Sequence, residues 1–111
     1  MKVSELQVEV LNYFVAKAEG LLNSQGLMFA DSSTNYPDFC TEWELAGPII
    51  GKELIKISPY HNRGGWWAEH AITKSVCEAP TPIIAAMRVY VESKFGTEVT
   101  LERDQNENSN R

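Results

Sequence analysis

The sequence predicts an α+β fold in which two amphipathic helices pack on a small antiparallel β-sheet or hairpin. Three observations predict this class. Apolar residues recur at helical spacing near the amino terminus and again at residues 81–96, and two extended apolar runs lie between these segments. A long segment at residues 23–47 follows neither period. We expect one domain over residues 1–101 in which this irregular segment is ordered.

The first helix is expected near the amino terminus. Ser4-Glu5-Leu6-Gln7 has the form of a capping box, in which Ser4 caps the helix and Gln7 reaches back. Apolar residues then keep helical spacing at Leu11, Phe14, Val15, Ala18 and Leu22. Gly20 is expected to end this helix.

The segment from residue 23 to residue 47 is rich in Ser, Asn, Asp, Gly and Pro. It also contains the aromatic residues Phe29, Tyr36, Phe39 and Trp43. A flexible linker would hold few such side chains, so we expect them to fix the segment to the core. We also expect the functional site here.

Two strands are expected in the middle of the chain. Residues 49–57 are extended and largely apolar, with Gly51 marking a bulge or turn, and residues 66–73 combine β-formers with approximate alternation. Residues 58–65 form the loop of an antiparallel hairpin. Since a lone hairpin is marginally stable, we expect the helices to cover it or a strand from residues 27–31 or 98–101 to extend it.

The best-specified element is a helix over residues 81–95. Thr81 can cap it, Pro82 suits its first position and Gly96 can take the turn that ends it. Ile84, Met87, Val91 and Phe95 form one apolar stripe, with Ile83 and Tyr90 beside it. Beyond Leu101 no apolar residue follows, so residues 102–111 are predicted to be a disordered tail.

Charge and composition argue against several classes of protein. The net charge of -5 disfavours generic nucleic-acid binding, because phosphate neutralisation needs basic side chains. No apolar run approaches the roughly 20 residues of a membrane helix, and the amino terminus lacks the order of a signal peptide. We therefore expect a protein of the cytoplasm that does not bind membranes.

Catalytic and metal chemistry find no local signature. Cys40 and Cys77 are far apart, and neither forms a close ligand pair with His61 or His70. We expect two free thiols, no bound metal, no cofactor and no catalytic residue. His70 alternates with Trp66 and Ala68, which favours a hydrogen-bonded, half-buried histidine over a general base.

Several sequence blocks together resemble a known family. These are Lys2 to Leu6, Val15 to Gly20, Thr41-Glu42-Trp43, Gly47-Pro48-Ile49-Ile50, Trp67-Ala68, Thr81 to Arg88, Ser93 to Gly96, and Glu98-Val99. They are similar, in this order, to the NinX-type proteins of lambdoid phages and prophages. The resemblance implies a small phage accessory protein that works in a bacterial cytoplasm. It carries no assigned biochemical activity and no catalytic residue.

The candidate site is a recognition surface for an unidentified host or phage protein. It comprises Thr41, Glu42, Trp43, Gly47 and Pro48. Trp43 is expected to be an exposed anchor, since aromatic side chains dominate protein interfaces. Trp67 and Arg88 are expected to support it, and Arg88 is expected to pair with Glu42, Glu44 or Glu53.

Two other functions stay open at this point. One is a small enzyme or ligand-binding protein with a pocket between the hairpin and the carboxyl-terminal helix. The other is a nucleic-acid-associated accessory protein that uses the local basic residues Lys52, Lys56 and Arg63. The acidic net charge disfavours the second.

Overall fold

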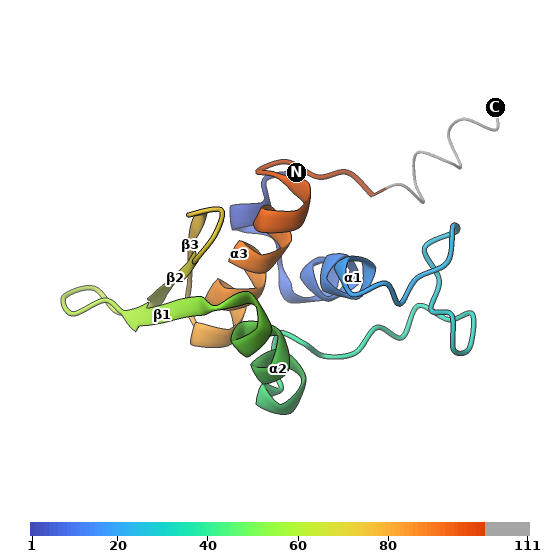
Figure 1. The fold of residues 1–111 in the computed structure, drawn as a ribbon, viewed down its shortest axis with the longest axis horizontal. Helices are drawn as coiled ribbons and strands as arrows, with labels where there is room; N and C mark the ends of the chain where they lie inside the picture. Colours follow the sequence, from blue (N-terminus) through green and yellow to red (C-terminus); the bar gives the residue numbers. More distant parts are fainter. Residues whose placement is uncertain (102–111) are drawn as a thin grey trace.

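The computed structural model describes residues 1–101, and it confirms the α+β fold class (Figure 1). In chain order the elements are the 3-10 helix η1 (Val3–Glu5), α1 (Val8–Ala18), α2 (Trp43–Glu53), β1 (Ile55–Pro59), β2 (Trp66–His70), β3 (Val76–Ala79) and α3 (Pro82–Phe95). The predicted tail at 102–111 lies outside the described residues. Within residues 1–101, no helix is long and apolar enough to cross a membrane.

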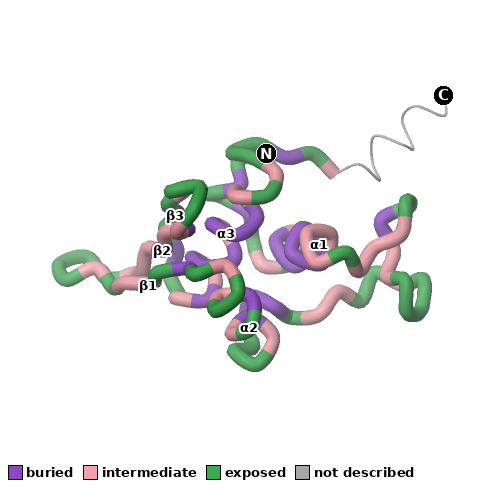
Figure 2. The backbone as a smooth tube through the Cα atoms, viewed as in Figure 1, coloured by how far each residue is buried: buried purple, intermediate pink, exposed green. Residues whose placement is uncertain are grey.

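Helix α3 begins and ends where the sequence predicts. The Thr81 hydroxyl accepts a hydrogen bond from the amide of Ile84 at 3.2 Å, and Gly96 follows the last turn with φ of 87°. The apolar surface of the helix is broader than the predicted stripe. Its buried residues are Ile83, Ala85, Ala86, Met87, Val89, Tyr90 and Val91. The helix is buried on several sides because it packs against the sheet, α1 and α2 (Figure 2).

The sheet has three antiparallel strands in the order β1-β2-β3. Ala68 of β2 lies opposite Ile57 and Cys77, and this face packs on α3. The side chains of Lys56 and Trp67 alternate to the opposite face. The hairpin of β1 and β2 was predicted, whereas β3 was not.

The predicted strand boundaries need correction. Residues 49–53 are helical, so β1 starts only at Ile55, and residues 71–73 form a turn rather than the end of β2. The strand that extends the hairpin comes from neither 27–31 nor 98–101. Residues in those segments make isolated bridges instead, Leu22 with Met28 and Lys2 with Glu98.

The capping box at Ser4 is also a wrong prediction. Ser4 lies in η1 and is exposed, and α1 begins only at Val8 with no side-chain cap at Gln7. The reason is tertiary, because Val3 is fully buried and its amide donates to the carbonyl of Thr97 at 2.9 Å. That anchor holds the segment in a separate short turn. Helix α1 ends at Ala18, just before Gly20 with φ of 77°.

Helix α2 forms where the sequence predicts a loop followed by a strand. Burial of Ala46 and Ile49, one turn apart, stabilises this helix against α3 and β1. Pro48 has no amide to donate inside the helix, so the carbonyl of exposed Glu44 is left to water. Apolar packing therefore outweighs the weak local helix propensity.

Residues 19–42 remain irregular. Phe39 is buried, and the Tyr36 hydroxyl donates to the carbonyl of Gly26 at 2.7 Å, so these two aromatic residues fix the segment as predicted. Phe29 does not, since 68% of its surface is exposed.

Candidate functional site

The predicted recognition residues of the 41–48 segment lie at the start of α2. Trp43 is the first residue of the helix and is 54% exposed, as expected of an anchor. Thr41, Glu42 and Pro48 are exposed as well, and Gly47 is half-buried. From Trp43 onward the segment is helical rather than irregular, so Trp43, Gly47 and Pro48 are held in a defined arrangement.

A strip without side chains runs beside Trp43 along α2. Gly47 and Gly51 follow Trp43 at four-residue intervals, and a Cβ placed on either glycine would meet nothing within 4 Å. Glycine inside a helix is destabilising by roughly 0.5–1 kcal/mol relative to alanine. No neighbour in the described chain requires this absence of side chains. We call Trp43, Gly47, Pro48 and Gly51 the Trp43 strip.

Arg88 lies on α3 and its guanidinium joins two backbone carbonyls. Nε and Nη2 donate to the carbonyl of Leu6 at 3.2 and 2.9 Å, and Nη1 donates to the carbonyl of Glu78 at 2.7 Å. The Leu6 carbonyl is available because α1 begins after it. Burial lowers the pKa of Arg88 from its ordinary value.

The predicted carboxylate partner of Arg88 is therefore wrong. Glu42 and Glu44 are exposed at the start of α2, and Glu53 binds His70 instead, at 2.8 Å. Backbone carbonyls accept hydrogen bonds from three of the five N–H donors of Arg88 in place of a carboxylate.

Arg88 also covers one edge of the sheet. The amide of His70 donates to the carbonyl of Ser75 at 3.0 Å. From there, residues of β3 alternate between those that hydrogen bond to β2 and those that do not. By this alternation the carbonyls of Val76 and Glu78 point away from β2. The bond from Arg88 to Glu78 occupies one of these edge groups, which would otherwise be free to pair with another strand.

Trp67 lies on the sheet face opposite α3. Its ring is 5.3 Å from the Nζ of Lys56 on β1. Trp67 and Arg88 thus bind partners in the sheet and at η1, and the Trp43 strip is formed by α2 alone. The structure does not bring the seven predicted residues into one cluster.

His70 is hydrogen bonded at both ring nitrogens. Its Nδ1 accepts from the amides of Ile72 and Thr73 at 3.2 and 3.3 Å, so the proton is on Nε2, which donates to Glu53. This hydrogen bond is the main reason that the pKa of Glu53 is lowered. His70 is buried and held in one tautomer, as expected of a structural histidine.

The two cysteines are buried thiols. Burial raises the pKa of both Cys40 and Cys77 to about 12, so neither is a thiolate near neutral pH. Within residues 1–101, no group of three or more His, Cys, Asp or Glu side chains could hold a metal ion.

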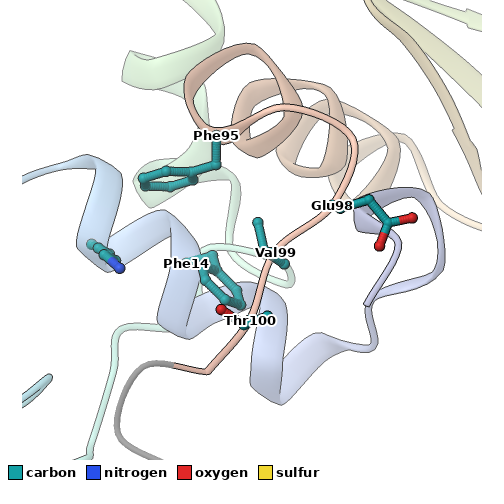
Figure 3. A pocket seen from close by; sticks show the side chains of 6 residues that line it. Phe14, Phe95, Glu98, Val99 and Thr100 are labelled. Carbon is teal, nitrogen blue, oxygen red and sulfur yellow. The ribbon is translucent and has the colours of Figure 1, made fainter. Parts of the chain in front are cut away.

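A small cavity of about 280 Å³ lies between α1 and the segment after α3 (Figure 3). The rings of Phe14 and Phe95 come from the two helices, with centroids 6.0 Å apart, and Val99 and Thr100 close the far side. Its walls are about equally polar and apolar, because Lys17, Glu98 and Thr100 line it beside the two rings.

A larger groove of about 590 Å³ lies between the β1–β2 loop, the end of β3 and α3. We call it the Arg88 groove, and the residues that line it include Ser4, Tyr60, Arg63, Trp66, Glu78 and Arg88. Its position is the one expected for a pocket between hairpin and carboxyl-terminal helix.

Sequence reasoning missed Gly51 and most of the Arg88 groove. Gly51 was assigned to a bulge in a strand, although its four-residue spacing from Gly47 and Trp43 is the signal that would have placed all three on one helix face. Tyr60 and Glu78 carry no comparable signal, because only the tertiary fold brings them to Arg88.

The comparison with known proteins supports the resemblance seen in the sequence. A protein-family model described as "Bacteriophage P22, NinX" matches residues 2–94. The matched range begins just before η1 and reaches the last turn of α3. No curated protein matches the chain.

Proposed function

Because the chain belongs to the bacteriophage P22 NinX family, we propose that it is a phage accessory protein that binds another protein through the Trp43 strip. The observation that carries the proposal is the indole of Trp43, 54% exposed at the head of a helix face that has glycine at two successive turns. Tryptophan is enriched among interface hot spots. Glycines beside it allow the backbone of a partner to approach closely.

The shape and charge of the surface describe the partner. The strip lies on the convex surface of α2, which suits a protein with an apolar pocket for the indole and a flat surface for the glycines. Glu42 and Glu44 flank Trp43 and are exposed, so basic residues on the rim of the partner would complement them. The partner is a phage or host protein, and binding takes place in the host cytoplasm.

The remaining chemistry supports a non-enzymatic role. The pKa of each thiol is far above neutral, and His70 is fully engaged in hydrogen bonds. Two of the three basic residues suggested for nucleic acid lie beside carboxylates, which weakens their attraction for a phosphate backbone. Lys52 pairs with Glu19 at 3.2 Å, and Arg63 pairs with Glu78 at 3.2 Å.

Two variants of the strip test the proposal against one control. Trp43→Ala removes the anchor, and Gly47→Gln places a long side chain on the strip where the fold has open space. Phe29→Ala is the control, since it removes an exposed aromatic side chain from the irregular segment. Each protein is used to capture partners from prophage-bearing cells, and the dissociation constant of each captured protein is then measured with purified components.

We expect both strip variants to weaken binding by more than about tenfold and the control to match the parent. Trp43→Ala should change the free energy of unfolding by less than about 1 kcal/mol, since the side chain is largely exposed. If both strip variants bind every captured protein as tightly as the parent does, the Trp43 strip is not the binding surface.

A further inference from the structure

The Arg88 groove holds two guanidinium groups. Arg88 reaches it from α3 and Arg63 from the β1–β2 loop, and Glu78 of β3 is the acidic residue in its lining. The lining therefore carries a formal charge of about +1 in a protein whose net charge is -5. Its volume of about 590 Å³ lies in the range of small-molecule sites, roughly 300–1,000 Å³.

Within residues 1–101, Arg88 forms no direct ion pair with a carboxylate, although the charge of Glu5 acts on its guanidinium. Among the described residues, no Asp or Glu oxygen lies within 4 Å of its nitrogens, and its three hydrogen bonds go to the carbonyls of Leu6 and Glu78. A guanidinium has five N–H donors. Two donors of Arg88 therefore remain for a ligand in the groove, and its half-buried charge favours an anion there.

Arg63 lines the same groove as Arg88. Its guanidinium lies over the ring of Tyr60, 4.0 Å from the centroid, and its Nη2 is 3.2 Å from Oε1 of Glu78. Both members of this ion pair are more than half exposed, so the pair is weak. A bound anion can replace the Glu78 carboxylate at Arg63 without disturbing a buried contact.

The backbone at the mouth of the groove is also open. Gly64 and Gly65 both have positive φ, and a Cβ on Gly64 would meet nothing within 4 Å. Trp66 and Tyr60 add aromatic surface to the lining. A ligand that joins an oxyanion to a flat ring would contact both kinds of surface.

We propose that the Arg88 groove is a binding site for a small aromatic molecule that carries an oxyanion, either a phosphate or a carboxylate. The oxyanion binds between Arg88 and Arg63, and the ring lies against the aromatic lining. Bidentate recognition of such planar or tetrahedral oxyanions is what the geometry of arginine favours. This site is separate from the Trp43 strip and does not depend on it.

Nuclear magnetic resonance titration of the intact protein tests the site. The probes are adenosine monophosphate with adenosine as its uncharged match, and phenylacetate with phenylacetamide as its uncharged match. We expect one charged probe to shift the amide signals of Gly64 and Gly65 and the Nε–H signal of Arg88 at millimolar concentration. A response to the monophosphate assigns phosphate chemistry, and a response to phenylacetate assigns carboxylate chemistry. If neither charged probe shifts these signals, or if an uncharged match binds equally well, the proposal is wrong.

Surface variants give the second arm of the experiment. Arg63→Gln should weaken binding of the active probe by about tenfold, the loss of one charge-assisted contact. Glu78→Gln should strengthen it, because the competing carboxylate is gone while the backbone carbonyl that binds Arg88 remains. Lys56→Gln is the control, since it removes the same charge from a sheet residue that does not line the groove. Equal weakening by Lys56→Gln and Arg63→Gln would show unspecific charge attraction and overturn the site.

Discussion

Replacing Arg88 by methionine should destabilise the fold, because Arg88 links the amino-terminal segment to the sheet. The variant keeps a long apolar side chain on α3 but loses the three hydrogen bonds to the carbonyls of Leu6 and Glu78. Leu6 is only 4% exposed, so its carbonyl oxygen loses its hydrogen-bond donors where little water can replace them. Glu78 is exposed, and its carbonyl regains water at little cost.

The expected loss follows from this asymmetry. An unsatisfied buried acceptor costs about 1–3 kcal/mol, and relief from desolvating the guanidinium offsets part of the lost attraction. We expect Arg88→Met to lower the free energy of unfolding by about 2 kcal/mol. In urea, where the slope for a small protein is about 1–3 kcal/mol per molar, the midpoint should fall by about 1 M.

The control is the same substitution elsewhere on α3. Lys94 is exposed and lies 3.8 Å from Glu53, a surface pair that contributes about 0–1 kcal/mol. Equilibrium unfolding in urea, followed by tryptophan fluorescence, compares Arg88→Met and Lys94→Met with the parent. The two carbonyl contacts do not stabilise the fold if both variants shift the midpoint equally. The same conclusion follows if Arg88→Met lowers the free energy of unfolding by less than about 0.5 kcal/mol.

Three further predictions follow from single residues. Met87→Ala should lower the free energy of unfolding by about 2–5 kcal/mol, because the side chain is fully buried, and a near-neutral result in urea would contradict that burial. The hydrogen bond from His70 lowers the pKa of Glu53 in the folded protein. The ionised Glu53 therefore stabilises the fold above pH 4.5, and this stabilisation is lost as the pH falls through the pKa of Glu53 in the folded protein. Glu53→Gln should therefore reduce the loss of stability between pH 5 and pH 3, measured as the urea midpoint, and an unchanged pH profile would refute this. Gly51→Ala should stabilise the protein by about 0.5–1 kcal/mol, because the added Cβ meets nothing and alanine favours the helix. Gly65→Ala should destabilise it by about 1–2 kcal/mol, because φ is +84° and a carbonyl of β3 lies 3.3 Å from the added Cβ. Thermal unfolding compares the two, and effects of the same sign would contradict the assignment.

The elements that the sequence predicts well are those whose signals are local. Helix α3 has a cap at Thr81, a proline at its first position and a glycine after its last turn, and each acts through its immediate neighbours. The exposure of Trp43 was predicted from its place between Glu42 and Glu44 in a segment expected to be irregular, and Trp43 is exposed although the segment is helical from that residue on.

The elements that it misses depend on distant contacts. Helix α2 contains two glycines and a proline, and it forms because Ala46 and Ile49 find apolar partners in α3 and β1. Strand β3 has only four residues, of which Cys77 and Ala79 are buried, too few to show a period. So short a segment becomes a strand only because it pairs with β2 in the folded protein.

The candidate sites show the same division. The partners of Arg88 are backbone carbonyls, and a carbonyl has no residue type that a sequence pattern could reveal. The sequence pointed correctly to Arg88 as a residue that needs partners, but it suggested carboxylates.

The order of elements from β1 to α3 has a consequence for how the protein folds. These elements are neighbours in the chain and in space, so residues 55–95 form the sheet and its covering helix through short loops. Contacts of low sequence separation form early, because little loop entropy is lost. We expect Met87→Ala to slow folding in stopped-flow measurements, and Val15→Ala in α1 to act mainly by speeding unfolding. In this order of events the amino-terminal third joins a scaffold that already exists, and the Leu6 carbonyl meets Arg88 after the rate-limiting step.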